Sequence, residues 1–222
     1  MKAMILAAGR GERMRPLTDH TPKPLLKVAD KALIEYHIEA LVRAGFADII
    51  INHAWLGAQF EQVLGAGERY GAHLQYSPEG ATALETGGGI FNALPLLGSG
   101  PFVVVNGDVW TDYPFERLPP NMATLAHLVL VPNPPQHPHG DFFLADGMLR
   151  ETGTVKYTFS GIGMYRAELF SGCRPGAFPL APLLRAVIGQ GQVSGELYDG
   201  GWYDIGTPAR MEQLDQKLRL RD

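Results

Sequence analysis

Disulfides, long apolar runs and an excess of basic residues are all missing from this chain. Its 222 residues include one cysteine, Cys173, so no internal disulfide can form. No apolar run is long enough to span a bilayer, and the first residues lack the charged and apolar regions of a secretory leader. A formal net charge of −4 gives no basic footprint for nucleic acid or an anionic membrane. We therefore expect a cytoplasmic protein with neither nucleic acid nor a membrane as partner.

Two familiar phosphate-binding loops are also absent. A P-loop requires the pattern G-x-x-x-x-G-K-[ST], which no segment supplies. The dinucleotide fingerprint G-x-G-x-x-G fails because Met14 stands where its third glycine belongs. The second expected strand ends in Asn52, whereas the fingerprint needs an acidic residue about there to hold a ribose. Binding of a dinucleotide cofactor is therefore the weaker interpretation.

A glycine-containing basic loop directly follows the first apolar run, Ala3 to Leu6. Gly9 and Gly11 allow the backbone to turn sharply and to approach a ligand closely. Arg13 and Lys23 add fixed positive charge, and backbone donors gathered with cations after a strand suit a polyphosphate. The alternative for Lys23 is an ordinary solvated surface lysine, and for the whole segment a surface loop.

Apolar periodicity alternates strands with helices along the chain. Expected strands cover 3–7, 49–52, 74–77, 102–106, 125–131 and 157–165, with a hairpin over 142–150 and short strands near 198 and 202. Expected helices cover 32–44, 56–64, 90–97, 180–188 and a last helix that begins at Pro208 with Thr207 as N-cap. The continuously apolar run 102–105 favours a buried parallel sheet with helices on both faces. The length suits a single α/β domain over residues 1–222.

Two further features point to a ligand site. Asp108 follows the strand 102–106, and ligands of open parallel sheets bind beyond the carboxyl ends of strands. A carboxylate there can hold Mg²⁺ against a triphosphate; the alternative is a hairpin, because Asn-Gly favours tight turns.

Gly87, Gly88 and Gly89 follow Thr86, a possible N-cap, and suggest that something approaches this backbone too closely for a Cβ. A nucleotide at a helix N-terminus would explain the three glycines, and a flexible loop is the alternative.

Taken together, these motifs resemble those of sugar-phosphate nucleotidylyltransferases. The matching runs are Leu6-Ala7-Ala8-Gly9-Arg10-Gly11-Glu12-Arg13-Met14, Pro16-Leu17-Thr18, Pro22-Lys23-Pro24, Ser77-Pro78-Glu79-Gly80, Glu85-Thr86-Gly87-Gly88-Gly89, Asn106-Gly107-Asp108 and Asp204-Ile205-Gly206-Thr207-Pro208. The resemblance implies a three-layer, Rossmann-like fold with a mixed, mostly parallel sheet. It implies Mg²⁺-dependent transfer of a nucleotidyl group from a nucleoside triphosphate to a sugar 1-phosphate. The runs 106–112 and 159–163 are most similar to members that use UTP and N-acetylmuramate 1-phosphate in recycling of cell-wall (peptidoglycan) sugars.

The resemblance also implies roles for individual residues. The implied catalytic residues are Arg13, Lys23 and Asp108, and the implied Mg²⁺ ligands are Asp108 and Asp204. Nucleotide contacts are implied for Leu6, Ala8, Gly9, Arg10, Gly11, Glu12, Arg13, Lys23, Pro78, Gly80, Gly87 and Asn106, in a half that covers about 1–112. Sugar-phosphate contacts are implied for Glu85, Gly140, Asp141, Glu151, Ser160 and Gly161, most of them in a half that covers about 113–222.

Several alternatives stay open on sequence alone. Enzymes that use dTTP or GTP with a hexose 1-phosphate, or CTP with a phosphorylated alcohol, begin with a similar loop. A non-catalytic nucleotide-sugar sensor is expected to lose the lysine or the carboxylates that are present here.

Asp204 lies far from Asp108 in the chain and reads equally well as a turn or capping residue. His137 and His139 lack the partners of a metal site and are expected at the rim of the sugar pocket or in solvent. We expect a monomer or a small homo-oligomer.

Overall fold

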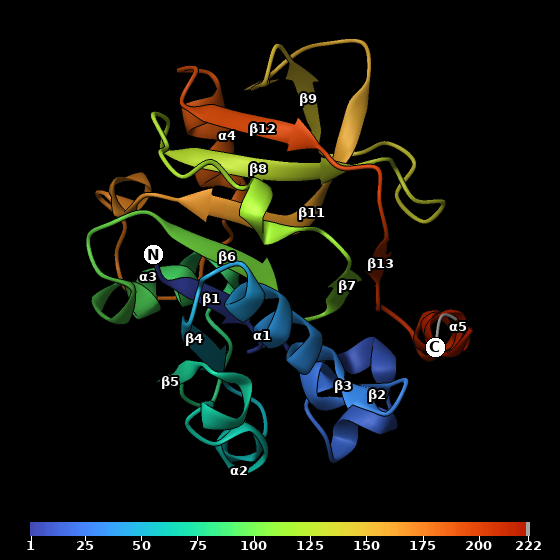
Figure 1. Cartoon of the computed structure of the whole chain (residues 1–222). Coiled ribbons are helices and arrows are strands. Elements are labelled where there is room, and N and C mark those ends of the chain that lie inside the picture. The colour runs from blue at the N-terminus through green and yellow to red at the C-terminus, as the bar shows by residue number, and fades with distance from the viewer. Residues whose placement is uncertain (221–222) are drawn as a thin grey trace.

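The computed structural model describes residues 1–220, which form a nine-stranded mixed sheet with helices on both faces (Figure 1). The strand order is β5-β4-β1-β6-β11-β8-β12-β10-β9. The strands are β1 (Ala3–Leu6), β4 (Asp48–His53), β5 (His73–Pro78), β6 (Phe102–Asn106), β8 (Ala126–Val131), β9 (Phe142–Ala145), β10 (Met148–Arg150), β11 (Lys156–Tyr165) and β12 (Val193–Leu197). The run β5-β4-β1-β6 is parallel, as is the pair β8-β12, and the remaining neighbours are antiparallel. The predicted mixed sheet is confirmed, with its parallel pairing concentrated in the first half.

Helices cover both faces because each turns an apolar stripe toward the sheet. The four that do so are α1 (Leu33–Arg43), α2 (Ala58–Leu64), α3 (Glu85–Leu97) and α4 (Ala181–Ile188). Buried side chains of α1 and α2 form one core with Ile5 of β1, whereas those of α3 and α4 form another with Met4. Neighbouring residues of one strand thus enter opposite cores, as strand geometry requires. No helix within residues 1–220 has the length and apolar character needed to cross a membrane.

Two short two-stranded sheets have pairings that were not predicted from the sequence, although a short strand was expected near residue 202. One pairs β2 (Lys27–Val28) with β3 (Lys31–Ala32), and the other pairs β7 (Val109–Thr111) with β13 (Trp202–Asp204). Strands of two or three residues are too short to show a periodic pattern. A second difference concerns α3, which begins at Glu85 with Leu84 as its N-cap, so Thr86 lies inside the helix and does not cap it.

The strand order creates a switch point between β1 and β6. From β1 the chain moves outward to β4 and β5, then returns through α3 to β6 on the other side of β1. Leu6 at the carboxyl end of β1 is in register with Asn52 of β4 and with Asn106 of β6. Loops diverge at such a point and leave a crevice beyond the strand ends, where open α/β sheets bind ligands.

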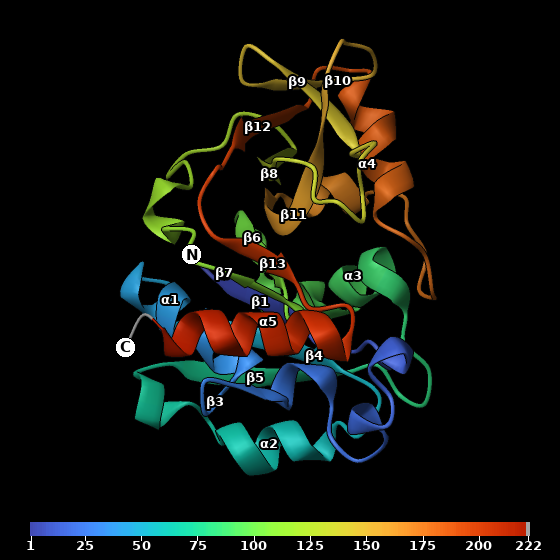
Figure 2. The same ribbon diagram turned by 90° about the vertical axis from the view of Figure 1, so that its right-hand side faces the viewer.

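The end of the described chain crosses back to the first half. After β12 it enters β13, and then α5 (Pro208–Arg219) packs beside β2 (Figure 2). Thr207 caps α5 as predicted, since its Oγ1 accepts a hydrogen bond from the backbone N–H of Arg210 at 3.4 Å. Leu214 and Leu218 belong to the same apolar cluster as Val28. Residues 202–219 are therefore neighbours of the first half in space although they come last in sequence.

Candidate active site

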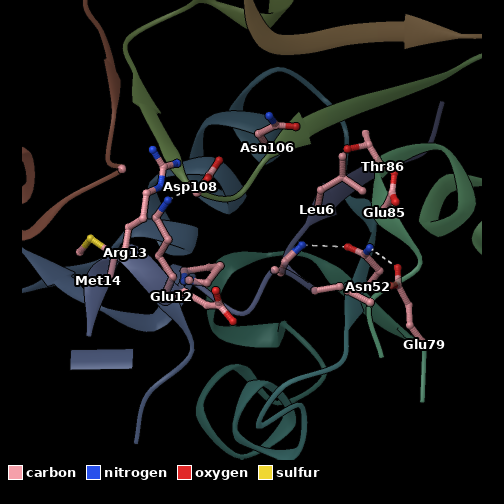
Figure 3. A pocket seen from close by; sticks show the side chains of 18 residues that line it. Leu6, Glu12, Arg13, Met14, Asn52, Glu79, Glu85, Thr86, Asn106 and Asp108 are labelled. Carbon is pink, nitrogen blue, oxygen red and sulfur yellow. Dashed lines mark hydrogen bonds and ion pairs between the residues drawn. The ribbon is translucent and has the colours of Figure 1, made fainter. Parts of the chain in front are cut away.

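A cavity of about 420 Å³ opens at the switch point, beyond the carboxyl ends of β1, β4 and β6 (Figure 3). The predicted residues that line it are Leu6, Ala8, Gly9, Gly11, Glu12, Arg13, Lys23, Glu85, Asn106 and Asp108. The other lining residues are Ala7, Met14, Pro24, Asn52, Glu79, Ala83, Thr86 and Gly206. Figure 3 shows Arg13 and Asp108 at one end of this cavity, with Asn52, Glu79, Glu85 and Thr86 toward the other.

The loop after β1 owes its shape to Gly11. This residue has a φ of +67°, and a Cβ there would lie 3.0 Å from Thr18 and 3.2 Å from Lys23. Only glycine meets both constraints without strain. The Thr18 hydroxyl also donates to the Gly11 carbonyl at 2.8 Å. The short 3₁₀ turn Glu12–Met14 follows, in which Met14 is buried and Arg13 lines the cavity.

Arg10, predicted to contact the nucleotide, lies outside the cavity. Its guanidinium stacks 3.7 Å from the centre of the Trp55 ring and donates to the Thr18 carbonyl at 2.8 Å. It also pairs with Asp19 at 3.3 Å. These partners make Arg10 a brace for the loop, because its donors and its charge are engaged within the protein.

A buried polar chain connects three loops at the side of the cavity opposite Arg13 (Figure 3). Asn52 is only 2% exposed; it accepts from the backbone N–H of Ala7 at 2.8 Å and donates to Glu79 at 2.6 Å. The second oxygen of Glu79 accepts from the backbone N–H of Leu84 at 2.6 Å, just before α3. A buried polar group without a partner is costly, so this chain fixes the ends of β1, β4 and β5 relative to α3.

The three glycines of α3 are explained by the protein's own packing. A Cβ at Gly87 would lie 2.6 Å from the Phe178 ring, one at Gly88 2.2 Å from the Gly176 carbonyl, and one at Gly89 2.5 Å from Glu79. The predicted close approach is therefore present, but the approaching groups are protein and not nucleotide. Gly87 itself is buried and is not among the residues that line the cavity, so its contact with a nucleotide stays a prediction.

Lys23 and Asp108 form an ion pair at the cationic end of the cavity. Lys23 is only 6% exposed, so the interpretation of a solvated surface lysine is wrong. Its Nζ donates to Oδ2 of Asp108 at 2.7 Å, and the Asp108 side chain keeps 44% of its exposure. The turn that carries Asp108 does not close a hairpin, because β7 pairs with β13 and not with β6. The Asp108 carboxylate is thus held by a buried cation and remains open to the cavity.

A second cavity of about 230 Å³ shares Asn106 and Asp108 with the first. Its other lining residues are Val109, Pro134, Gln136, His137, Thr158, Phe159, Ser160, Trp202 and Asp204. Ser160 was predicted in the sugar-phosphate site, and His137 was expected at its rim. His139 is exposed and is not part of the lining. Two cavities that meet at one carboxylate provide space for two substrates to approach each other.

The pairing of β13 with β7 brings Asp204 to this second cavity. Asp204 is in register with Val109, and the backbone N–H of Ile205 donates to the Asp108 carbonyl at 3.0 Å. The Asp204 carboxylate forms an ion pair with Arg210, one turn into α5. Within residues 1–220 no group of three or more histidine, cysteine or acidic side chains is arranged to hold a metal. Any metal here would therefore take the remaining ligands from substrate or water.

Other predicted residues lie close to the cavities without lining them. Pro78 ends β5 and Gly80 forms the next turn with a φ of +81°, while Glu79 between them reaches the first cavity. Gly161 has a φ of +82°, and a Cβ there would lie 2.7 Å from the Asn106 amide. Its small size thus leaves room for Asn106, which lines both cavities.

The remaining sugar-phosphate candidates differ in their positions. Gly140 and Asp141 belong to the loop between β8 and β9 that carries His137, and Asp141 contacts that histidine at 3.0 Å. Glu151 is exposed and lines neither cavity. Glu85 lines the first cavity and not the second.

A buried neutral histidine fixes the strand that follows Asp108. His37 of α1 is 1% exposed, and its Nε2 lies 2.8 Å from the Val109 carbonyl. Burial lowers the pKa of His37 to about 4, because desolvation disfavours the charged ring. The ring is therefore neutral at pH 7 and donates its Nε2–H to that carbonyl, which anchors β7 to α1.

Known proteins are similar to this chain in sequence and in fold. The family model described as nucleotidyl transferase matches residues 2–146. An N-acetylmuramate alpha-1-phosphate uridylyltransferase of Neisseria meningitidis is 54% identical over 96% of both chains. One of Caulobacter vibrioides is 36% identical over 97% of this chain and 96% of its own. A crystal structure of a Bacillus anthracis protein assigned as a glucose-1-phosphate thymidylyltransferase has a TM-score of 0.88 at 21% identity, over 99% of this chain and 95% of that one. The last likeness shows the fold, and the family model together with the two full-length relatives shows that this chain belongs to the nucleotidyl transferase family.

Proposed function

We propose that the protein transfers a uridylyl group from UTP to N-acetylmuramate 1-phosphate and releases pyrophosphate. The observation that carries the proposal is the pair of cavities that share Asn106 and Asp108. The two full-length relatives are named for this reaction, which supports UTP and N-acetylmuramate 1-phosphate over the other nucleotide and sugar pairs.

The reaction needs no nucleophile from the protein. A phosphate monoester has a second pKa near 6, so the sugar 1-phosphate is largely dianionic at pH 7. One of its oxygens attacks the α-phosphorus of UTP in line, and the bond from that phosphorus to the bridging oxygen of pyrophosphate breaks. Catalysis then consists of positioning the two substrates and stabilising the negative charge that develops.

The first cavity is assigned to UTP in the orientation that its charges favour. Arg13 and Lys23 line one end of the cavity, and the backbone N–H groups near Gly9 and Gly11 are further donors. This end suits the β- and γ-phosphates, which carry most of the charge of UTP. The nucleoside then occupies the end lined by Asn52, Glu79 and Thr86, leaving the sugar 1-phosphate to the second cavity. In this arrangement the α-phosphorus lies near Asp108, where the cavities meet.

We infer that Asp108 and Asp204 hold Mg²⁺. Both carboxylates line the second cavity and keep part of their exposure, and Mg²⁺ typically binds one or two carboxylates together with substrate phosphates. When bound, the ion would neutralise part of the negative charge on the reacting phosphates. The existing ion pairs with Lys23 and Arg210 balance both carboxylates in the absence of substrate.

The test is release of pyrophosphate by the purified protein across a grid of UTP, dTTP, GTP and CTP against several sugar 1-phosphates. We expect turnover only with both substrates and with Mg²⁺, fastest with UTP and N-acetylmuramate 1-phosphate, and abolished by EDTA. Tight nucleotide binding without turnover in any combination would contradict an enzyme and favour a sensor. Fastest turnover with another pair would replace the proposed substrates.

A further inference from the structure

The second cavity has an unusual balance of charge for a site that receives an anionic substrate. Asp108 and Asp204 contribute two carboxylates, and the described residues of its lining include no lysine or arginine. His137 is the one lining residue among them that is able to carry a positive charge. Because the two aspartates already pair with Lys23 and Arg210, His137 is the lining residue best able to attract an acidic group on a sugar placed there.

His137 stands on a loop that is rigidly built. The loop 132–141 connects β8 to β9, and its Asn133 donates to the Lys156 carbonyl at 2.9 Å and accepts from the Thr158 hydroxyl at 2.9 Å. At its other end the backbone N–H of Asp141 donates to the Tyr157 carbonyl at 2.8 Å. Both ends of the loop are thus tied to β11, whose residues 158–160 line the same cavity. A loop ordered in this way presents a side chain without the cost of ordering it on binding.

Asp141 holds the imidazole of His137 in place. One carboxylate oxygen lies 3.0 Å from Nε2 of His137, and the other accepts from the backbone N–H of Phe159 at 2.8 Å. A carboxylate on one ring nitrogen orients the ring and leaves the other nitrogen for a ligand. In the part of the chain that the structure describes, Nδ1 of His137 has no hydrogen-bond partner. An imidazole that carries both protons donates one hydrogen bond from each nitrogen, and could therefore join Asp141 to a ligand carboxylate.

We propose that His137 binds the carboxylate of the lactyl ether that distinguishes N-acetylmuramate from N-acetylglucosamine, and that Asp141 is its positioning residue. The inference rests on the proposed function and adds the origin of its sugar preference. Among the described residues that line the cavity, His137 alone can offer a positive charge to the lactyl carboxylate, and the glucosamine compound has no such group to place there.

The experiment compares wild type with His137→Ala and His137→Lys, using His139→Ala as the matched control, since His139 is exposed on the same loop. Binding of N-acetylmuramate 1-phosphate and N-acetylglucosamine 1-phosphate is measured by calorimetry, and kcat and KM are measured for both with UTP. We expect His137→Ala to weaken binding of the muramate compound, and to raise its KM, by about 10- to 100-fold, the value of a hydrogen bond to a charged group. The glucosamine compound should change less than about twofold, because it has no carboxylate to lose.

Two further variants sharpen the test. His137→Lys should recover part of the lost preference, because it restores a cation. Asp141→Asn should weaken the same preference less than His137→Ala, in KM and not in kcat. An equal loss for both sugars in His137→Ala, or an equal loss in His139→Ala, would overturn the proposal in favour of a general effect on the loop.

Binding separates this inference from the proposed function. Preferential binding of the muramate compound that depends on His137, without turnover, would support the inference and contradict the enzyme. Turnover with no preference of the wild-type protein for the acidic sugar would overturn the inference and leave the nucleotidyl transfer intact.

Discussion

The two cavities that meet at Asp108 are built in different ways. The first lies at the carboxyl ends of the parallel strands β1, β4 and β6, and most of its walls come from the segments that follow β1 and β5. The second takes its walls from β7, β11, β13 and the loop 132–141, which meet only through long-range pairing. The first cavity therefore depends on local backbone geometry and buried hydrogen bonds, and the second on contacts between distant segments.

The ionic contacts show the opposite pattern, because Lys23 and Asp108 are 85 positions apart in the chain whereas Arg210 and Asp204 are 6 positions apart. Lys23 comes from the segment that follows the glycine loop and crosses to Asp108 as a buried cation. Arg210 comes from the last helix and pairs with Asp204 on a strand only three residues long. A substitution in the first cavity should therefore affect binding of the nucleotide and the rate of the chemical step, whereas one in the second should affect binding of the metal and of the sugar 1-phosphate.

The largest effect is expected at Lys23, which pairs with Asp108 where the two cavities meet. Lys23→Met keeps the apolar stem and removes the cation, so turnover should fall by about 10²–10³, as for loss of one preorganised donor in an active site. Steady-state kcat with UTP and the sugar 1-phosphate measures this. Lys27→Met is the control, since Lys27 is exposed on β2 and should leave kcat unchanged. Near-normal turnover of Lys23→Met would show that another cation stabilises the negative charge on the phosphates.

Acid should loosen the anchor of β7 through His37. Its pKa is about 4 in the folded protein against 6.5 unfolded, so between these values the unfolded chain binds more protons. Stability from this group is thus complete above pH 6.5 and is lost as pH falls toward 4, by up to about 3 kcal/mol. Urea unfolding at pH 7, 6, 5 and 4 measures the loss in wild type and in His37→Gln, whose amide can still donate to Val109.

The difference between those two proteins isolates His37. His53 and His127 have lowered pKa values for the same reason, desolvation, and contribute in the same direction in both proteins. His37→Gln should therefore keep a smaller pH dependence, while the exposed-site variant His139→Gln should match wild type. Identical pH profiles for wild type and His37→Gln would show that His37 does not contribute.

Asn52→Ala tests the hydrogen-bonded wall of the first cavity. The change leaves the backbone N–H of Ala7 and the Glu79 carboxylate without their partner, so unfolding free energy should fall by about 1–3 kcal/mol. KM for UTP should rise as the loops lose their alignment, with little change in KM for the sugar 1-phosphate. Asn92→Ala, which removes an amide on the exposed side of α3, provides the control. An unchanged KM for UTP would show that the hydrogen bonds of Asn52 contribute to stability and not to nucleotide binding.

The smallest expected effect concerns metal binding at Asp204. Asp204→Asn should raise the Mg²⁺ concentration for half-maximal rate by about tenfold or more, the scale seen when even an outer partner of a metal is lost. Asp108→Asn should raise it further, because Asp108 lines both cavities. Asp199→Asn, at an exposed position before β13, should leave the Mg²⁺ dependence as it was. An unchanged Mg²⁺ dependence in Asp204→Asn would show that Asp204 does not bind the metal and serves only as the ion-pair partner of Arg210.

Most of the longer elements and the position of the glycine-containing basic loop could be predicted from the sequence alone. β6 coincides with the predicted strand, the hairpin turns at Asp146 and Gly147, and Thr207 caps the last helix. Gly11 was predicted to permit a sharp turn, and it adopts one. These features are local: they depend on apolar period, on turn chemistry and on side chains that bond to neighbouring backbone, all of which a short window of sequence contains.

Tertiary structure alone decided which residues meet and which way their side chains point. Arg10 and Arg13 occur on one loop, yet the first braces Trp55 and the second lines the cavity. The space beside the glycines of α3 is occupied by Phe178, Gly176 and Glu79, and the hydrogen bond from Asn52 to Glu79 joins the ends of β4 and β5. Asp204 reaches the site only because β13 pairs with β7 and α5 folds back over β2. Such outcomes depend on long-range burial and pairing, whose partners no local pattern names.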